Sequence, residues 1–92
     1  MDIVDDYIDS ENLESLKKIG FDSEKTTTSI VVKFLYEKFN VWIGIKKIFN
    51  PNEFGYTIQT DKTFKVSKEY YKNSETAINA GIKEFLINNG GI

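Results

Sequence analysis

Residues 28–49, TSIVVKFLYEKFN followed by VWIGIKKIF, decide the fold of this chain. In the first part, apolar side chains recur at steps of three and four residues, namely Val31, Val32, Leu35, Tyr36 and Phe39. That spacing is typical of a helix with one buried face, and Asn40 is a suitable residue to end it. From Val41 the period changes from 3.6 to two, which predicts a strand over residues 41–49.

The predicted strand has two chemically different faces. We expect the aliphatic side chains of one face to pack under the helices, and these are Val41, Ile43 and Ile45. The other face carries Trp42, Gly44, Lys46 and Ile48. The functional interpretation depends on this geometry, because it turns the only tryptophan away from the aliphatic side chains and towards a possible partner.

A first helix is predicted over residues 11–19, with Asp9 or Ser10 as its cap. Acids in its first turn and lysines in its last turn suit the helix dipole. Gly20 is the expected residue just beyond its end, and Phe21 is the expected hydrophobic contact that closes this end of the helix.

After the turn at residues 50–53, strands are predicted over residues 54–60 and 63–67, which completes a three-stranded antiparallel meander. In the last strand, period-two alternation predicts two inward side chains, Phe64 and Val66. The same alternation predicts two outward side chains, Lys65 and Ser67. Tyr56 and Ile58 of the middle strand are expected to face inward.

The final helix is predicted over residues 74–88, with Ser74 as its cap. Gly81 in its middle costs about 1 kcal/mol relative to alanine, so we interpret it as a point of close contact with an aromatic side chain or the backbone. The chain is therefore a single α+β domain of order α-α-β-β-β-α, with helices packed on one face of the sheet. Its acidic N-terminal arm, extra helix and α-β-β-β-α core occupy residues 1–9, 10–20 and 27–88.

Composition excludes several kinds of chemistry. The 92 residues include no histidine and no cysteine, which removes the usual general base, the thiol nucleophile and the commonest metal ligands. All twelve cationic side chains are lysines, whereas specific recognition of bases and phosphates usually employs arginine. We expect no enzyme, no metal site, no cofactor and no membrane span, and a cytoplasmic location.

Two surfaces are candidates for binding. The outward sheet face carries Trp42, Lys46, Ile48, Gln59 and Lys65. Aromatic and cationic side chains together suit a protein interface or a stacking surface for bases. The acidic arm carries Asp2, Asp5, Asp6 and Asp9 and could bind a basic partner. The alternatives are a solvated terminus for the arm, and coverage of Trp42 by the arm or by a second subunit.

The α-β-β-β-α order is topologically similar to that of double-stranded-RNA-binding domains. Such domains present a lysine cluster at the start of the last helix, where residues 72–77 of this chain hold one lysine and one acid. Their first hairpin loop reaches the minor groove with a Gly-Pro-His type of motif, whereas this chain has Asn-Pro-Asn-Glu at 50–53. The resemblance implies a similar scaffold without its RNA-binding positions.

Three segments resemble a family of small phage and prophage proteins, mostly from Bacteroidetes-type bacteria. They read LKKIGFD at residues 16–22, TTSIVVKFLYEKFNV at 27–41 and YKNSETAINAGI at 71–82. The chain departs from the family by lacking the proline before the second helix and the usual arginine. These motifs are core and cap residues, so the resemblance implies a fold and a phage setting rather than an activity.

The leading functional hypothesis is a non-enzymatic phage accessory protein in the host cytoplasm. It would bind a host protein, with inhibition of antiviral defence, as by anti-CRISPR proteins, as one such role. The alternatives are nucleotide or nucleic-acid binding on the sheet face through Trp42, Tyr56, Lys46 and Lys65, which the absence of arginine makes less favoured, and a virion or scaffold component. A homodimer through the sheet or an edge strand is a further use of the same surface.

Overall fold

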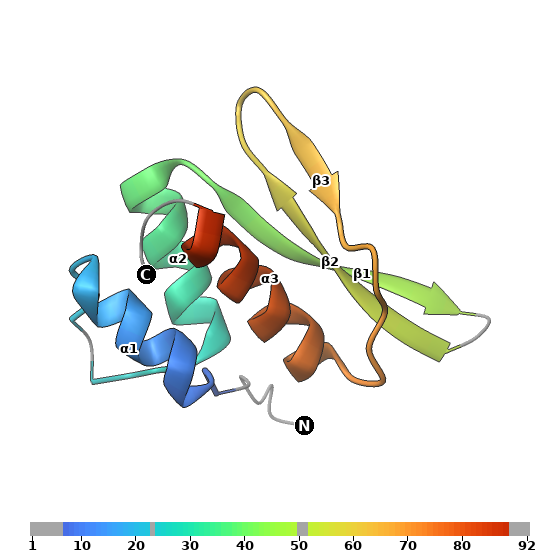
Figure 1. Ribbon diagram of the computed structural model, residues 1–92, viewed down its shortest axis with the longest axis horizontal. Helices are drawn as coiled ribbons and strands as arrows, with labels where there is room; N and C mark the ends of the chain where they lie inside the picture. Colours follow the sequence, from blue (N-terminus) through green and yellow to red (C-terminus); the bar gives the residue numbers. More distant parts are fainter. Residues whose placement is uncertain (1–6, 23, 50–51, 89–92) are drawn as a thin grey trace.

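The computed structural model describes residues 7–22, 24–49 and 52–88. Within them the element order is α1 (Ser10–Lys18), α2 (Thr28–Phe39), β1 (Trp42–Phe49), β2 (Asn52–Gln59), β3 (Phe64–Val66) and α3 (Ser74–Asn88). The predicted α+β class and α-α-β-β-β-α order are confirmed. The helices gather on one side of a twisted antiparallel sheet of order β1-β2-β3 (Figure 1).

The ends of α1 and α2 are set by single residues, as predicted. Gly20 has a φ of 98°, and the Gly20 and Phe21 amides donate to the carbonyls of Lys17 and Leu16, which closes α1 in a Schellman motif. Asn40 adopts the left-handed conformation, with φ 56°, and its amide donates to the Tyr36 carbonyl. The left-handed residue turns the chain directly from α2 into β1.

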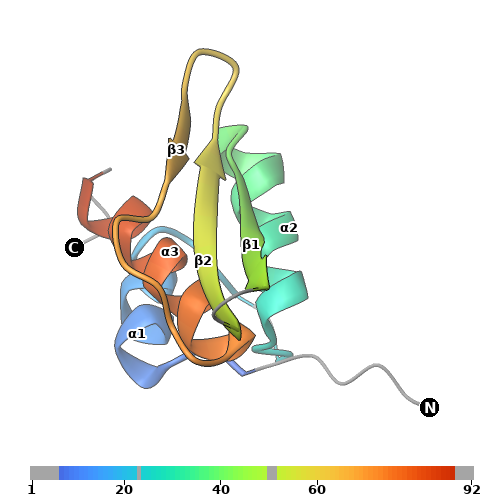
Figure 2. The ribbon, with the colours of Figure 1, turned by 90° about the vertical axis from the view of Figure 1, so that its right-hand side faces the viewer.

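Helix α3 covers the inner face of the sheet, where it packs on β2 and β1, while α1 packs on α3. Helix α2 contacts both β1 and α3, and Figure 2 shows it next to β1, on the side away from β2. The fully buried side chains come from every layer: Leu16, Val31, Leu35, Val41, Ile82 and Leu86. The core therefore lies between α3 and the sheet and continues between the helices.

The predicted faces of the third strand are wrong. Lys65 lies opposite Ile58 and so points to the helix side, while Phe64 lies outward and is 63% exposed. Ser67, predicted outward, is buried, and its Oγ accepts a hydrogen bond from the Tyr56 amide. A three-residue strand has too little hydrophobic pattern to fix its register, so the preceding turn fixes it instead.

That turn is held by Thr60. Its amide donates to the Thr63 carbonyl at 2.8 Å, and its Oγ1 accepts hydrogen bonds from the amides of Lys62 and Thr63. These bonds make a compact loop whose length determines which residues of β3 face the helices.

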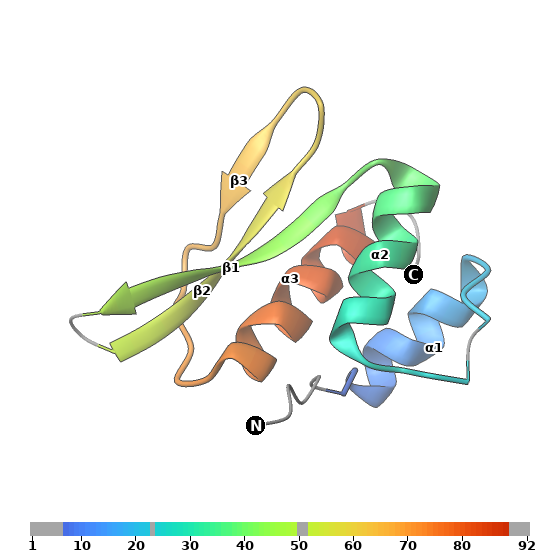
Figure 3. The same ribbon diagram turned by 180° about the vertical axis from the view of Figure 1, so that it is seen from behind.

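Two smaller predictions also need correction. Ile45, predicted to pack under the helices with Val41 and Ile43, is 41% exposed, whereas the other two are buried. Helix α2 diverges from β1 along the strand (Figure 3). The helices therefore leave Ile45 partly uncovered. The cap of α3 is Asn73 rather than Ser74, because the Asn73 Oδ1 accepts a hydrogen bond from the Thr76 amide at 2.8 Å.

The described end of the N-terminal arm is attached to the domain. Tyr7 forms a β-bridge with Thr27, and the Ile8 amide donates to the Thr26 carbonyl. The side chain of Ile8 is buried in the core. Of the four acids predicted to bind a partner, Asp9 is exposed at the start of α1, whereas Asp2, Asp5 and Asp6 lie outside the described residues.

Candidate binding groove between the edge strand and two helices

The predicted binding face is only partly assembled. Trp42, Lys46 and Ile48 alternate along one face of β1, and Gln59 lies opposite Trp42 on β2. Lys65 is not among them, because its ammonium reaches the Glu84 carboxylate of α3 on the helix side. The fifth position of the predicted site is therefore wrong, and the outer face has fewer cations than expected.

Trp42 is half-exposed at the free edge of the sheet. Its ring meets Tyr36 of α2 edge-on, with 5.6 Å between the ring centroids, and 50% of the residue is accessible to solvent. The indole also borders Gly44, where an added Cβ would lie 3.8 Å from Nε1. The indole was predicted to turn away from the aliphatic side chains, but it leans over the strand edge towards α2 and lies beside Ile43 and Val32. It is therefore neither a core side chain nor an open stacking surface.

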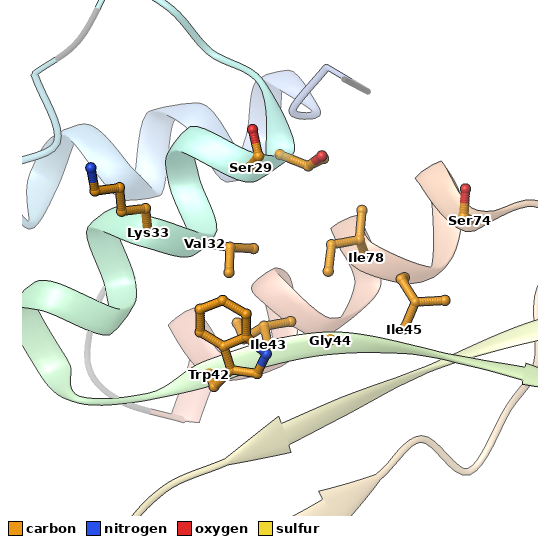
Figure 4. Close-up of a pocket in the computed structure, with 10 residues that line it drawn as sticks. Ser29, Val32, Lys33, Trp42, Ile43, Gly44, Ile45, Ser74 and Ile78 are labelled. Carbon is orange, nitrogen blue, oxygen red and sulfur yellow. The ribbon is translucent and has the colours of Figure 1, made fainter. Parts of the chain in front are cut away.

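Beside Trp42 lies an apolar groove of about 440 Å³. Its apolar lining consists of Val32 from α2, Ile78 from α3, and Trp42, Ile43 and Ile45 from β1 (Figure 4). Its polar rim is formed by Thr28, Ser29, Lys33 and Ser74. The groove arises where α2 and β1 diverge and the first turns of α3 close the floor.

Sequence reasoning missed most of this groove. It assigned Val32 to the core, gave no function to Ile78 and placed Ile45 under the helices. These residues come from three elements that are distant in the sequence, and each fits an ordinary buried helix or strand position. No signal in the sequence separates these positions from ordinary buried ones.

The helix end at the groove is electropositive. Helix α2 begins at Thr28, the side chain of its N-cap residue Thr27 makes no capping hydrogen bond, and its first turn holds no acid. Lys33, one turn further on, adds a positive charge to the same rim. The helix dipole and the ammonium therefore favour a negatively charged group at this end of the groove.

A second polar cluster ties the sheet to α3. The Tyr56 hydroxyl donates to Glu84 Oε1 at 2.5 Å, and Lys65 Nζ lies 2.9 Å from Oε2. The contact between the Lys65 ammonium and Glu84 Oε2 is an ion pair rather than a hydrogen bond. Burial acts to raise the pKa of Glu84, but Tyr56 and Lys65 outweigh burial and hold it below its ordinary value. Burial and the Glu84 carboxylate raise the pKa of Tyr56.

The Glu84 cluster predicts a specific dependence of stability on pH. Because the folded-state pKa of Glu84 is lowered, its ionised form stabilises the fold above the unfolded value of about 4.3, and this stability is lost as pH falls through the folded-state pKa. Glu84→Gln should therefore destabilise the protein at pH 7 and cost less at pH 3. Urea unfolding at both pH values measures the difference.

Glu37→Gln is the matched control, because Glu37 is exposed on α2 and should show no such change. An equal cost of Glu84→Gln at pH 3 and pH 7 would contradict the role assigned to the ionised carboxylate.

Among the described residues, no group of three or more acidic side chains is placed to hold a metal ion. The helices in the same part of the chain are all too short or too polar to cross a membrane. No family model, curated protein or solved structure matches this chain. The resemblances to phage proteins and to double-stranded-RNA-binding domains therefore stay predictions.

Proposed function

We propose that this protein is a non-enzymatic module that binds another protein through the groove between α2, β1 and α3. One observation carries the proposal: an apolar groove of about 440 Å³ opens beside an edge strand and is bordered by a half-exposed tryptophan. Tryptophan at the rim of an apolar depression is typical of an interface hot spot. A host protein as the partner, with antiviral defence as one setting, remains the expectation from the phage resemblance.

The groove's chemistry favours binding over catalysis. Of its described lining residues, Lys33 is the one with a titratable side chain. No nucleophile–base pair lies among these residues, whose polar side chains on the rim are three hydroxyls and the Lys33 ammonium. Such a surface gains binding energy from apolar contact area and offers no means of proton transfer.

The nucleic-acid alternative draws less support. It needed Trp42, Tyr56, Lys46 and Lys65 on a single face, but Tyr56 is buried and bonded to Glu84 on the helix side, where Lys65 also lies. Lys46 remains outward, whereas the Trp42 indole leans over the edge of β1 into the groove, so the four residues do not share a face. The virion or scaffold alternative stays a prediction.

The proposal is tested by site-specific photo-crosslinking in the expected bacterial host. The photoreactive residue p-benzoylphenylalanine is placed at position 45 on the groove, or at position 64 as the matched control. Ile45 and Phe64 are both exposed apolar residues, on opposite edges of the sheet. We expect a discrete adduct with a second protein from position 45 alone. Equal adducts from both positions, or none from position 45, would overturn the proposal.

A further inference from the structure

We propose that the groove accepts an extended segment of the partner protein, which adds to the free edge of β1 as a fourth strand. Alternate apolar side chains of that segment enter the groove, and an acidic residue lies at the start of α2. This inference rests on the proposed function and specifies the chemistry of the partner. Three independent features carry it: the backbone of β1, the apolar lining and the charge of the rim.

The first feature is the backbone of β1. Phe54 of β2 exchanges two hydrogen bonds with Tyr71, both at 2.7 Å, on the side of β2 away from β1. Backbone groups of successive strand residues point to alternate edges, so Gly55 points towards β1 and pairs with Lys46. The backbone amide and carbonyl of Lys46 therefore bond to β2. Those of the adjacent Ile45 point to the opposite edge of β1.

The same alternation applies at Ile43, two residues away. In the described part of the chain, β1 pairs with β2 alone, so this edge has no strand partner. An edge strand with unpaired backbone groups is a template for another strand. Ile43 and Ile45 both line the groove, which places the hydrogen-bonding edge and the apolar surface side by side.

The second feature is the position of the apolar surface. A strand added to β1 would lie about 4.8 Å away and send every second side chain towards the helix side. There they would contact Val32 of α2 and Ile78 of α3, and cover Ile45. The volume of about 440 Å³ lies within the range of roughly 300–1,000 Å³ that holds ligands in other proteins. A bound helix would also contact this surface but would leave the edge of β1 unpaired.

The third feature is the charge of the rim. The N-terminal end of α2, with no acid in its first turn, and the nearby Lys33 create positive potential at one end of the groove. An acidic side chain at the end of the bound segment would offset both. The favoured partner is therefore a segment of alternating apolar and polar residues that ends in aspartate or glutamate.

The test uses the full chain and two synthetic acetylated peptides of alternating valine and threonine, with two aspartates at one end or the other. Trp42, the only tryptophan, reports binding by fluorescence, and the amide resonances of Ile43 and Ile45 report pairing at the edge. We expect one peptide order to bind. N-methylation of its alternate peptide bonds on the pairing side should weaken binding about tenfold or more, because two backbone donors are lost.

Variants separate the groove from the rest of the surface. Ile45→Asp should abolish binding, whereas Phe64→Asp, an equivalent change at an exposed position on β3, should leave it unchanged. Lys33→Gln should weaken binding of the aspartate-containing peptide severalfold. It should not change binding of a peptide in which asparagines replace the aspartates. These responses together would establish strand addition at β1 with an acidic preference.

Other outcomes overturn the inference. Binding that is insensitive to N-methylation would show that the occupant does not pair with β1. A dimer in sedimentation that Ile45→Asp dissociates would assign the edge to a second copy of the chain. If neither peptide binds at millimolar concentration while position 45 still crosslinks to a partner, the extended acidic segment is rejected. The proposed function then stays in place.

Discussion

Gly81→Ala is expected to destabilise the protein by about 1–3 kcal/mol, as overpacking of a core typically does. Helix propensity alone would predict the opposite, because alanine stabilises a helix by about 1 kcal/mol relative to glycine. Gly81 lies in the middle of α3 directly beneath Tyr56 of β2, and an added Cβ would be 2.9 Å from the Tyr56 Cγ. Tyr56 cannot easily withdraw, because it is buried and its hydroxyl is bonded to Glu84. Urea unfolding followed by circular dichroism measures the loss.

Lys83→Gly provides the comparison for this substitution. Lys83 is exposed in the same helix, and its ion pair with Glu11 is exposed on both sides and so contributes little. This change should cost about 1 kcal/mol through propensity alone. If Gly81→Ala instead stabilises the protein by a similar amount, close packing of α3 on Tyr56 is wrong.

Asn79→Leu is expected to cost about 2–4 kcal/mol, since it removes several buried hydrogen bonds at once. Asn79 is 2% exposed, and its Oδ1 accepts from the Asp9 amide at 2.9 Å. Its Nδ2 donates to the Tyr7 and Glu75 carbonyls at 3.1 and 3.0 Å. Leucine would fill the space and leave the Asp9 amide without this acceptor. Thermal and urea unfolding measure the global effect, and hydrogen exchange at Asp9 measures the local one.

Asn12→Ala is the milder variant of the same network. The Asn12 Nδ2 donates to the Asn79 carbonyl at 2.8 Å and, more weakly, to the Asn79 Oδ1 at 3.4 Å. Asn12→Ala removes both bonds but keeps the Asn79 side chain and its bond to the Asp9 amide. We expect a loss of about 1–2 kcal/mol and little change in exchange at Asp9. If Asn79→Leu speeds exchange at Asp9 without lowering global stability, the network holds the arm alone and has no role in the core.

The order of helices and strands could be predicted because local patterns agree with the global fold. The apolar steps of α2, the change of period at β1 and the stops at Gly20 and Asn40 each depend on neighbouring residues only. Gly81 was also interpreted correctly, since an unfavourable residue in a helix needs a packing reason. The cap of α3 was misplaced by one residue, because Asn73 and Ser74 are both suitable caps.

The candidate site could not be predicted to the same extent. Trp42 was expected to point away from the aliphatic side chains, with coverage as the alternative. It is half-exposed, but its contact with Tyr36 and its place beside Val32 in the groove follow from the way α2 leans on β1. Lys65 was assigned to the wrong face, because a short turn and three residues of strand set its register. Ile78 is 33 residues from Ile45 in the chain, and no local pattern relates them.

The amino-acid sequence by itself determined the secondary-structure order, the α+β class and the absence of histidine and cysteine chemistry, because these depend on composition and on the period of the apolar residues. The tertiary structure alone decided which edge of the described sheet has no strand partner, where α2 and β1 diverge to leave an apolar groove, and which lysine lies on the helix side of the sheet. Those features depend on crossing angles and strand register, which are set by contacts between residues far apart in the chain.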